Sequence, residues 1–266
     1  MKEVSSNMRS LKLAVVCAGL VAAFSAAAFA EDLTIVSKVT SGDKPAETRT
    51  SWISNDHMRV QNPDGGEFMT DYASGNITIM DGRKKEYFVM TRQEIEAASA
   101  QMQAQMKEME AKMQSLPPEV REKMAGAMGG FSQAVDVKKG TGGRTVAGYS
   151  CENWIVSVGT MVKNEQCITT QIEFPMPAYD AMKSFSAGFA SNPMAKSMGQ
   201  MYEKFKQMKG FPIYSSSTAS ILGKTTTTVT EVAEVKKGPI PASTWEIPAG
   251  YKKVDSPMAK MLQKQR

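Results

Sequence analysis

The sequence predicts an α+β fold in which methionine-rich helices pack across the open face of a curved antiparallel sheet, a half-open barrel. Three observations support this prediction. Short segments that alternate apolar and polar residues fill the first part of the chain, as in half-buried strands. Two later segments change to apolar spacings of three and four, which are typical of amphipathic helices. Strand-like segments then return, so we expect the helices to interrupt one sheet in a single domain.

The first thirty residues have the pattern of a secretory signal peptide. Basic residues precede the apolar run LAVVCAGLVAAFSAAAFA, which ends in the small-residue pattern Ala28-Phe29-Ala30. This run is too short and too rich in alanine for a convincing membrane span. We therefore expect cleavage of the signal peptide (residues 1–30) after Ala30 and export of residues 31–266, with no transmembrane span in the mature chain. A retained anchor is the alternative.

The first part of the mature chain predicts an antiparallel meander. Asn, Asp, Gly and Pro residues separate its apolar–polar segments, as expected for turns. The Asp81-Gly82 pair is the strongest hairpin signal in the chain. We expect six strands, at residues 32–40, 47–54, 57–61, 67–72, 76–80 and 83–90.

A helical hairpin is expected at about 91–130. Thr91 and Glu94 have the spacing of a capping box, in which the threonine hydroxyl accepts from the Glu94 amide and the Glu94 carboxylate accepts from the Thr91 amide. An apolar stripe with heptad-like spacing follows from Ile95 to Leu116. Two prolines then end the first helix and begin a second one.

The rest of the chain predicts a second helical pair with strands on either side. The helical pair is expected at about 178–209, and the tail from 256 is either a helix or disordered. A flexible Gly-Thr-Gly-Gly segment is expected to separate the first two of the remaining strands. Those strands are expected at residues 132–140, 144–158, 165–174, 211–219, 224–237, 243–247 and 251–254.

The mature chain contains two cysteines, Cys151 and Cys167. An even number of cysteines in an exported protein indicates a disulfide. The segment between them has a strand–turn–strand pattern, and a hairpin brings its two ends close together. A pair of metal thiolates is the alternative, although the only histidine, His57, is far away in the sequence. We therefore predict one disulfide between these cysteines.

Composition and motifs exclude several classes of function. The formal net charge is +5 over 266 residues with both signs interspersed, too small a surplus to indicate nucleic acid binding. His57 has no serine in a nucleophile-elbow motif to act with. The segment GTGGRTVAG lacks the Gly-Lys-Ser/Thr ending of a phosphate-binding loop. We expect no enzyme activity, no catalytic residue, no cofactor and no metal site.

The methionine stripes are the main candidates for a functional site. Thioether sulfur suits Cu(I), but the stripes also contain Ile, Leu and Phe, which do not bind metals. Flexible methionines are typical of surfaces that adapt to varied apolar partners. The alternative is that they fill the core. The candidate ligand-lining residues are Met102, Met106, Met109, Met113, Met194, Met198, Met201, Phe205, Trp52 and Trp154.

Two segments carry a resemblance to a known family. The segment RTVAGYSCENWIV, which contains Cys151, and the closing element from Trp245 to Tyr251 resemble the bacterial domain of unknown function 4412. That family is similar in architecture to the periplasmic lipoprotein carriers of the LolA and LppX kind, in which helices form a lid over an apolar cavity in a half-open barrel. The resemblance implies a single LolA-like domain over 31–266 in the periplasm, and it assigns no catalytic residue.

These features predict a non-enzymatic periplasmic protein that binds or carries an apolar ligand, either a lipid or a lipidated partner protein. One alternative is a Cu(I)-binding protein that uses its methionines as ligands. Another is a structural envelope module in which the methionine-rich helices contact a partner protein.

Overall fold

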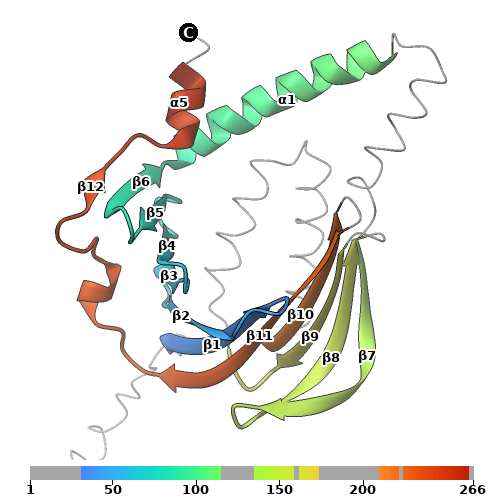
Figure 1. Cartoon of the computed structure of the whole chain (residues 1–266). Helices are drawn as coiled ribbons and strands as arrows, with labels where there is room; N and C mark the ends of the chain where they lie inside the picture. Colours follow the sequence, from blue (N-terminus) through green and yellow to red (C-terminus); the bar gives the residue numbers. More distant parts are fainter. Residues whose placement is uncertain (1–30, 115–134, 159–161, 174–209, 222–223, 264–266) are drawn as a thin grey trace, which may run out of the picture.

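The computed structural model describes residues 31–114, 135–158, 162–173, 210–221 and 224–263. Twelve strands form one open, curved sheet in the order β12-β6-β5-β4-β3-β2-β1-β11-β10-β9-β8-β7 (Figure 1). All neighbouring strands pair antiparallel except β12 and β6, which are parallel. The predicted curved antiparallel sheet is therefore confirmed. The strands are β1 (Leu33–Ser41), β2 (Glu47–Ile53), β3 (His57–Gln61), β4 (Gly66–Asp71), β5 (Ile77–Asp81), β6 (Glu86–Met90), β7 (Val135–Val146), β8 (Tyr149–Val158), β9 (Val162–Thr169), β10 (Phe211–Ile221), β11 (Lys224–Lys237) and β12 (Lys252–Lys253).

The helical part of the prediction is only partly covered by the described residues. Helix α1 (Arg92–Gln114) confirms the first helix of the hairpin expected at 91–130. The second helix of that hairpin and the helical pair expected at 178–209 lie outside the described residues. Strands dominate the described part of the chain, so the α+β label and the packing of helices across the open face are not confirmed.

The sheet consists of two meanders joined by the pairing of β1 with β11. Strands β1 to β6 follow one another on one side of this junction, and β11 to β7 lie on the other side. The junction pairs nine residues of β1 with β11, from Leu33 opposite Lys237 to Ser41 opposite Thr228. Leu33, Ile35 and Val232 are buried at this junction and belong to the main hydrophobic core. Burial of these side chains therefore stabilises the pairing of the two meanders.

The turn between β5 and β6 differs from the tight Asp81-Gly82 hairpin that the sequence predicts. Strand β6 begins at Glu86 rather than at 83. The Asp81 carboxylate accepts hydrogen bonds from the backbone amides of Arg83 and Lys84, at 3.0 and 3.1 Å. These bonds to the side chain hold the backbone in a longer loop, in which the positive φ of 53° falls at Lys85.

The first two strands of the second meander are also arranged differently from the prediction. The Gly-Thr-Gly-Gly segment lies within β7, where the pairing with β8 shifts between Lys139 and Gly143. Gly143 is required there because a Cβ atom at this position would lie 2.3 Å from the Cys151 carbonyl oxygen. The chain reverses instead at Ala147 and Gly148, which both have positive φ, as a two-residue hairpin turn requires.

The predicted disulfide between Cys151 and Cys167 is confirmed. The S–S distance is 2.04 Å, and the bond links the neighbouring strands β8 and β9. Both cysteines are buried in the main core with Val146 and Ile213. The bond therefore fixes the pairing of two strands at a position where the side chains exclude water.

Helix α1 leaves the sheet at β6 and extends over its open side (Figure 1). The predicted capping box is present, because Thr91 Oγ1 accepts from the Glu94 amide at 3.2 Å and Glu94 Oε2 accepts from the Thr91 amide at 2.8 Å. Ile95 and Ala98 are buried, and α1 packs against α5 (Pro257–Gln263). Of the two alternatives for the tail, a helix or a disordered segment, the structure has the helix, which contacts α1.

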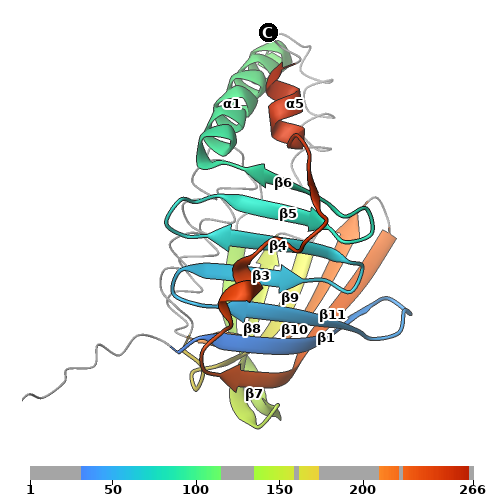
Figure 2. The same cartoon turned by 90° about the vertical axis from the view of Figure 1, so that its left-hand side faces the viewer.

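Residues 238–256, here called the C-terminal strap, cross the outer face of the first meander (Figure 2). The sequence predicts a strand at 243–247, but the structure has a 3-10 helix, η2 (Ala242–Trp245). The second expected strand is shortened to β12, and its Lys252 amide donates to the Lys85 carbonyl oxygen at 2.8 Å. The strap therefore completes the sheet edge at β6 and covers the outer face.

Removal of the disulfide is expected to lower the free energy of unfolding. Replacing Cys151 and Cys167 with serine removes a link between positions 16 residues apart, for which loop entropy predicts a loss of about 2 to 4 kcal/mol. Urea denaturation measures this loss. Reductant should destabilise the wild type similarly and leave the double variant unaffected. Equal urea midpoints for the oxidised wild type and the double variant would contradict a stabilising role.

Candidate functional site

The inner face of the first meander carries a row of apolar side chains. Strand register places these side chains on one face, opposite to the face that the C-terminal strap covers. All of them except Val60 are only half-buried. We call this set the apolar inner patch, and it consists of Met58, Val60, Phe68, Ile77, Ile79, Phe88 and Met90.

The outer face of the same strands is more buried and partly polar. Arg59 and Glu67 are each 7% exposed, and Arg59 Nε donates to Glu67 Oε2 at 2.9 Å. Arg59 Nη1 also donates to the carbonyl oxygens of Thr244 and Glu246 in the strap, at 2.6 and 3.1 Å. Met80 is 1% exposed on this side. Arg59, Glu67 and Met80 are thus buried on the outer face, while the apolar side chains on the inner face, like Met69 and Val89 on the outer face, are half-buried.

A second region of the inner face is polar and uncharged. It lies on β9, β10 and β11, where register aligns the residues across the three strands. The side-chain oxygens of Asn164 and Gln166 are buried and have no hydrogen-bond partner among the described contacts. A buried acceptor without a partner costs about 1 to 3 kcal/mol. We call this set the polar inner strip, and it consists of Asn164, Gln166, Ser215, Ser217, Thr228 and Thr230.

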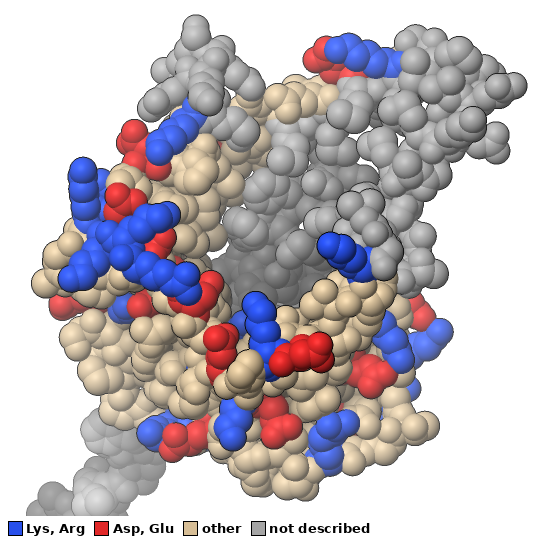
Figure 3. All heavy atoms as spheres, in the orientation of Figure 1, with Lys and Arg blue, Asp and Glu red and all other residues tan. Residues whose placement is uncertain are grey.

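Charged side chains lie on other parts of the surface. Figure 3 shows lysine, arginine, aspartate and glutamate side chains of both signs interspersed over the visible described surface. Several pairs of opposite charge are exposed, among them Lys163 with Glu165 at 2.7 Å. Exposed pairs of this kind contribute little to stability. The inner patch and the strip have no charged residue among their members, and the charged residues of β2 on the same face are Glu47 and Arg49.

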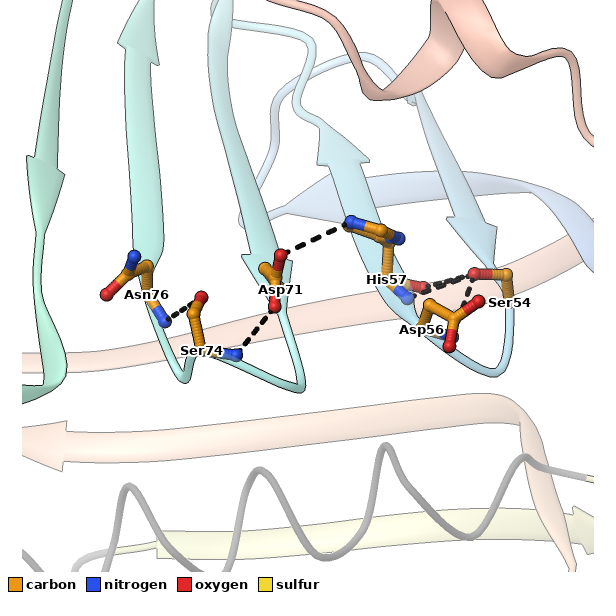
Figure 4. A network of polar contacts seen from close by, with 6 residues as sticks. All are labelled: Ser54, Asp56, His57, Asp71, Ser74 and Asn76. Carbon is orange, nitrogen blue, oxygen red and sulfur yellow. Dashed lines mark hydrogen bonds and ion pairs between the residues drawn. The ribbon is translucent and has the colours of Figure 1, made fainter.

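His57 lies in a polar network at the start of β3 (Figure 4). Its Nε2 atom is 3.5 Å from Asp71 Oδ2, and its ring stacks on Trp245 with centroids 5.2 Å apart. The Ser54 hydroxyl accepts from the backbone amides of Asp56 and His57, at 3.2 and 3.0 Å, and donates to the His57 carbonyl oxygen. Serine therefore bonds to the backbone of His57 rather than to its imidazole, which is the geometry of a turn.

A small pocket lies beside the bulge of β7. It has a volume of about 200 Å³, and its lining includes Arg144, Asn153, Glu165 and Tyr214. The Arg144 guanidinium lies over the Tyr214 ring, 4.1 Å from its centroid, in a cation–π contact. Register places both residues on the outer face of the sheet. The lining also includes Trp154 and Gln166, so this pocket adjoins the polar inner strip.

The ten predicted lining residues are only partly placed by the structure. Met102, Met106, Met109 and Met113 lie in α1, but their side chains are not described. Met194, Met198, Met201 and Phe205 lie outside the described residues.

The two tryptophans among those candidates lie on opposite faces. Trp154 pairs with Gln166 and borders the polar inner strip, whereas Trp52 pairs with Arg59 on the outer face. Trp52 therefore does not share a face with Trp154, because strand residues point to alternate faces and register separates these two. A ligand-lining role for either residue stays a prediction. Sequence reasoning missed the apolar inner patch, although the alternation in β4 to β6 contained its signal.

Two classes of feature are absent from the residues that the structure describes. No three His, Cys, Asp or Glu side chains gather there in a way that could hold a metal ion. Within the same residues, no helix has both the length and the apolar character needed to cross a membrane.

The fold and the inner face define a class of protein: an open antiparallel sheet that presents an apolar and a polar surface on its concave side. The chain belongs to the family described as a domain of unknown function (DUF4412), whose model matches residues 56–251. The predicted family membership is thereby confirmed. No curated protein matches the sequence.

Several solved structures are similar to this chain at low identity. PNGF-II has 10% identity and a TM-score of 0.41, and the match covers 89% of this chain and 34% of that one. The Pseudomonas aeruginosa MucA/MucB complex has 13% identity and a TM-score of 0.39, and the match covers 83% of this chain and 56% of that one. A LolA superfamily protein from Nitrosomonas europaea has 8% identity and a TM-score of 0.24, and the match covers 82% of this chain and 90% of that one. The chain spans about a third of the first protein and just over half of the second. The proposals below rest on this chain's own residues.

The buried ion pair under the strap provides a test of how the outer face is held. Glu67→Gln leaves the Arg59 charge buried without its counter-ion, so we expect the free energy of unfolding to fall by about 3 kcal/mol. Chemical denaturation measures this loss. The double variant Arg59→Met with Glu67→Leu should recover part of the stability, since no unpaired charge remains. A double variant less stable than Glu67→Gln would contradict this explanation.

The Asp71 network predicts a pH dependence of stability. The pKa of Asp71 lies below its usual value, mainly because the Ser74 amide donates to the carboxylate at 2.8 Å; burial opposes this effect. Since the folded pKa is lowered, the carboxylate stabilises the fold above about pH 3.9, and this contribution disappears as the pH falls through the folded pKa. We expect Asp71→Asn to unfold at a lower temperature than wild type at pH 6, and this difference to shrink toward pH 2. A difference that grows on acidification would contradict the assignment.

Proposed function

We propose that this protein is a non-enzymatic, exported periplasmic protein that binds an apolar ligand on the inner face of its sheet. The observation that carries the proposal is the apolar inner patch. Its phenylalanines, isoleucines and methionines are half-buried on the concave side, whereas Arg59, Glu67 and Met80 on the outer face of the same strands are buried. Contiguous exposed apolar side chains in a folded protein mark binding surfaces for apolar molecules or partners.

The disulfide supports the proposed location. Cys151 and Cys167 are joined, and such bonds persist in oxidising compartments such as the bacterial periplasm. The leader pattern of residues 1–30, which lie outside the described part, supports export by a signal peptide.

The His57 network supports a non-enzymatic role. The imidazole of the only histidine faces Asp71 and stacks on Trp245, and the nearby Ser54 hydroxyl is engaged by backbone amides. These contacts tie the strap to β3 and stabilise the turn before it. These contacts give His57 a structural function, without a catalytic one.

A substitution in the patch tests the proposed function with a matched control. Phe88 lies in the patch, and its neighbour Val89 lies on the outer face of β6; both are half-buried. We expect Phe88→Gln to weaken binding of the uncharged fluorescent probe N-phenylnaphthylamine at least about tenfold, since burial of a phenylalanine contributes about 1.5 to 3 kcal/mol. Val89→Gln should leave the affinity unchanged.

Fluorescence titration of the mature protein measures both affinities, and circular dichroism checks that the variants are folded. Absence of probe binding to the wild type would overturn the proposal, because the inner face would then be filled by the chain itself. Equal weakening by the two substitutions would also count against it, since the effect would not be specific to the inner face.

A further inference from the structure

The polar inner strip contains two hydrogen-bond acceptors that the described protein contacts leave unused. Gln166 is 8% exposed, and its side-chain oxygen is buried without a partner. The Asn164 side-chain oxygen is in the same state two residues earlier on β9. Since strand residues two apart share a face, the two amides point to the same side of the sheet. Buried amide oxygens normally have a partner, so an unpaired one requires an explanation.

The neighbours of these acceptors are small hydroxyl side chains. Gln166 pairs with Ser215 of β10, which pairs with Thr230 of β11, and Asn164 aligns in the same way with Ser217 and Thr228. Each hydroxyl both donates and accepts hydrogen bonds. The result is a patch of amides and hydroxyls three strands wide, with the half-buried Trp154 beside it on β8.

The chemistry of the strip favours an uncharged partner that donates hydrogen bonds. None of the six strip residues is charged, so none of them neutralises a carboxylate, a phosphate or a cation. In the same register row, the charged residues are Lys139 on β7 and Glu47 on β2, each two strands away from the strip. Burying an unpaired charge costs far more than burying a polar group that finds a hydrogen bond. The unused acceptors call for O–H or N–H groups. These are the groups of a glycerol, sugar or amide head.

The strip and the apolar inner patch lie on one continuous inner face. Four strand-to-strand steps separate β10 in the strip from β3 in the patch. On β1, the strip residue Thr230 aligns with Val39, whereas the patch residue Val60 aligns through β2 with Ile35. Strand spacing and residue rise together give about 23 Å along the curved surface, and less across its concave side. One acyl chain spans about 15 Å, half of a bilayer core. A single amphiphile is therefore long enough to reach from the strip toward the patch.

We propose that the polar inner strip is a head-group site for an amphiphile whose acyl tail lies toward the apolar inner patch, and that the head group is uncharged and rich in hydrogen-bond donors. This inference rests on the proposed function, because it assumes that the inner face binds an apolar ligand. Gln166 and Asn164 accept from the head group, and the serine and threonine hydroxyls complete its hydrogen bonds.

Competition between lipids with one acyl chain and different heads tests this inference. Monooleoylglycerol offers two hydroxyl donors, whereas oleate at neutral pH offers a carboxylate, which only accepts. We expect the mature wild-type protein to release N-phenylnaphthylamine at about tenfold lower concentrations of monooleoylglycerol than of oleate. Gln166→Leu should abolish this preference while the affinity for the probe itself stays unchanged.

The variants also provide a readout that does not depend on lipid. Because Gln166→Leu removes an unpaired buried acceptor, we expect the ligand-free variant to unfold at a higher temperature than the wild type. Thr218→Val is the matched control, since Thr218 lies on the outer face of β10 and bonds to Thr227 at 3.0 Å. This control should keep the wild-type preference for monooleoylglycerol.

The outcomes separate this inference from the proposed function. If the wild type binds no probe, the inner face is filled by the chain itself and both proposals fail. If the probe binds but the two lipids compete equally, or if Gln166→Leu keeps the preference, the head-group site is wrong and apolar binding stands. Loss of the preference in Thr218→Val as well would also overturn the assignment to the inner strip.

Discussion

The ladder between β1 and β11 is the interaction on which the rest of the structure depends. It joins a strand at the start of the described chain to one near its end, so both meanders meet in a single sheet. Leu33, Ile35 and Val232 bury the ladder's inner side. Without this pairing, β1 to β6 and β7 to β11 would be two smaller sheets with an exposed edge each. The continuous inner face, and every relation between its apolar and polar regions, exists only because this long-range pairing forms.

The C-terminal strap determines which face of the first meander is open. It supplies two carbonyl oxygens to Arg59, and it stacks Trp245 on His57. Its later part pairs with β6, and Ser256 donates to Glu94 at the start of α1. The strap thus protects the outer face and the edge strand from water and from other chains. Because the strap covers Arg59, Glu67 and Met80 on the outer face, the proposed ligand surface is the opposite face.

Local signals predicted much of this fold, and non-local pairing explains what they missed. Alternation defined β1 to β6, the Thr91–Glu94 spacing defined the start of α1, and two cysteines around a hairpin pattern defined the disulfide. The strand expected at 243–247 became η2 because its residues contact the outer face instead of pairing in the ladder.

The faces of the two tryptophans and the unpaired acceptors could not be predicted either. They depend on register across six strands and on bulges in β10 and β11, and a shift of one residue exchanges the two faces. Gln166 in particular looks like an ordinary polar strand residue, and Asn164 lies outside the expected strand, until the pairing partners of β9 are known. This dependence on register also explains why the methionine stripes dominated the sequence analysis. A helix reveals its apolar side through its own periodicity, whereas a surface built from seven strands becomes visible only when all of them are paired. The apolar inner patch and the polar inner strip are properties of the assembled sheet, and a ligand that spans both would therefore report on the integrity of the β1–β11 junction itself.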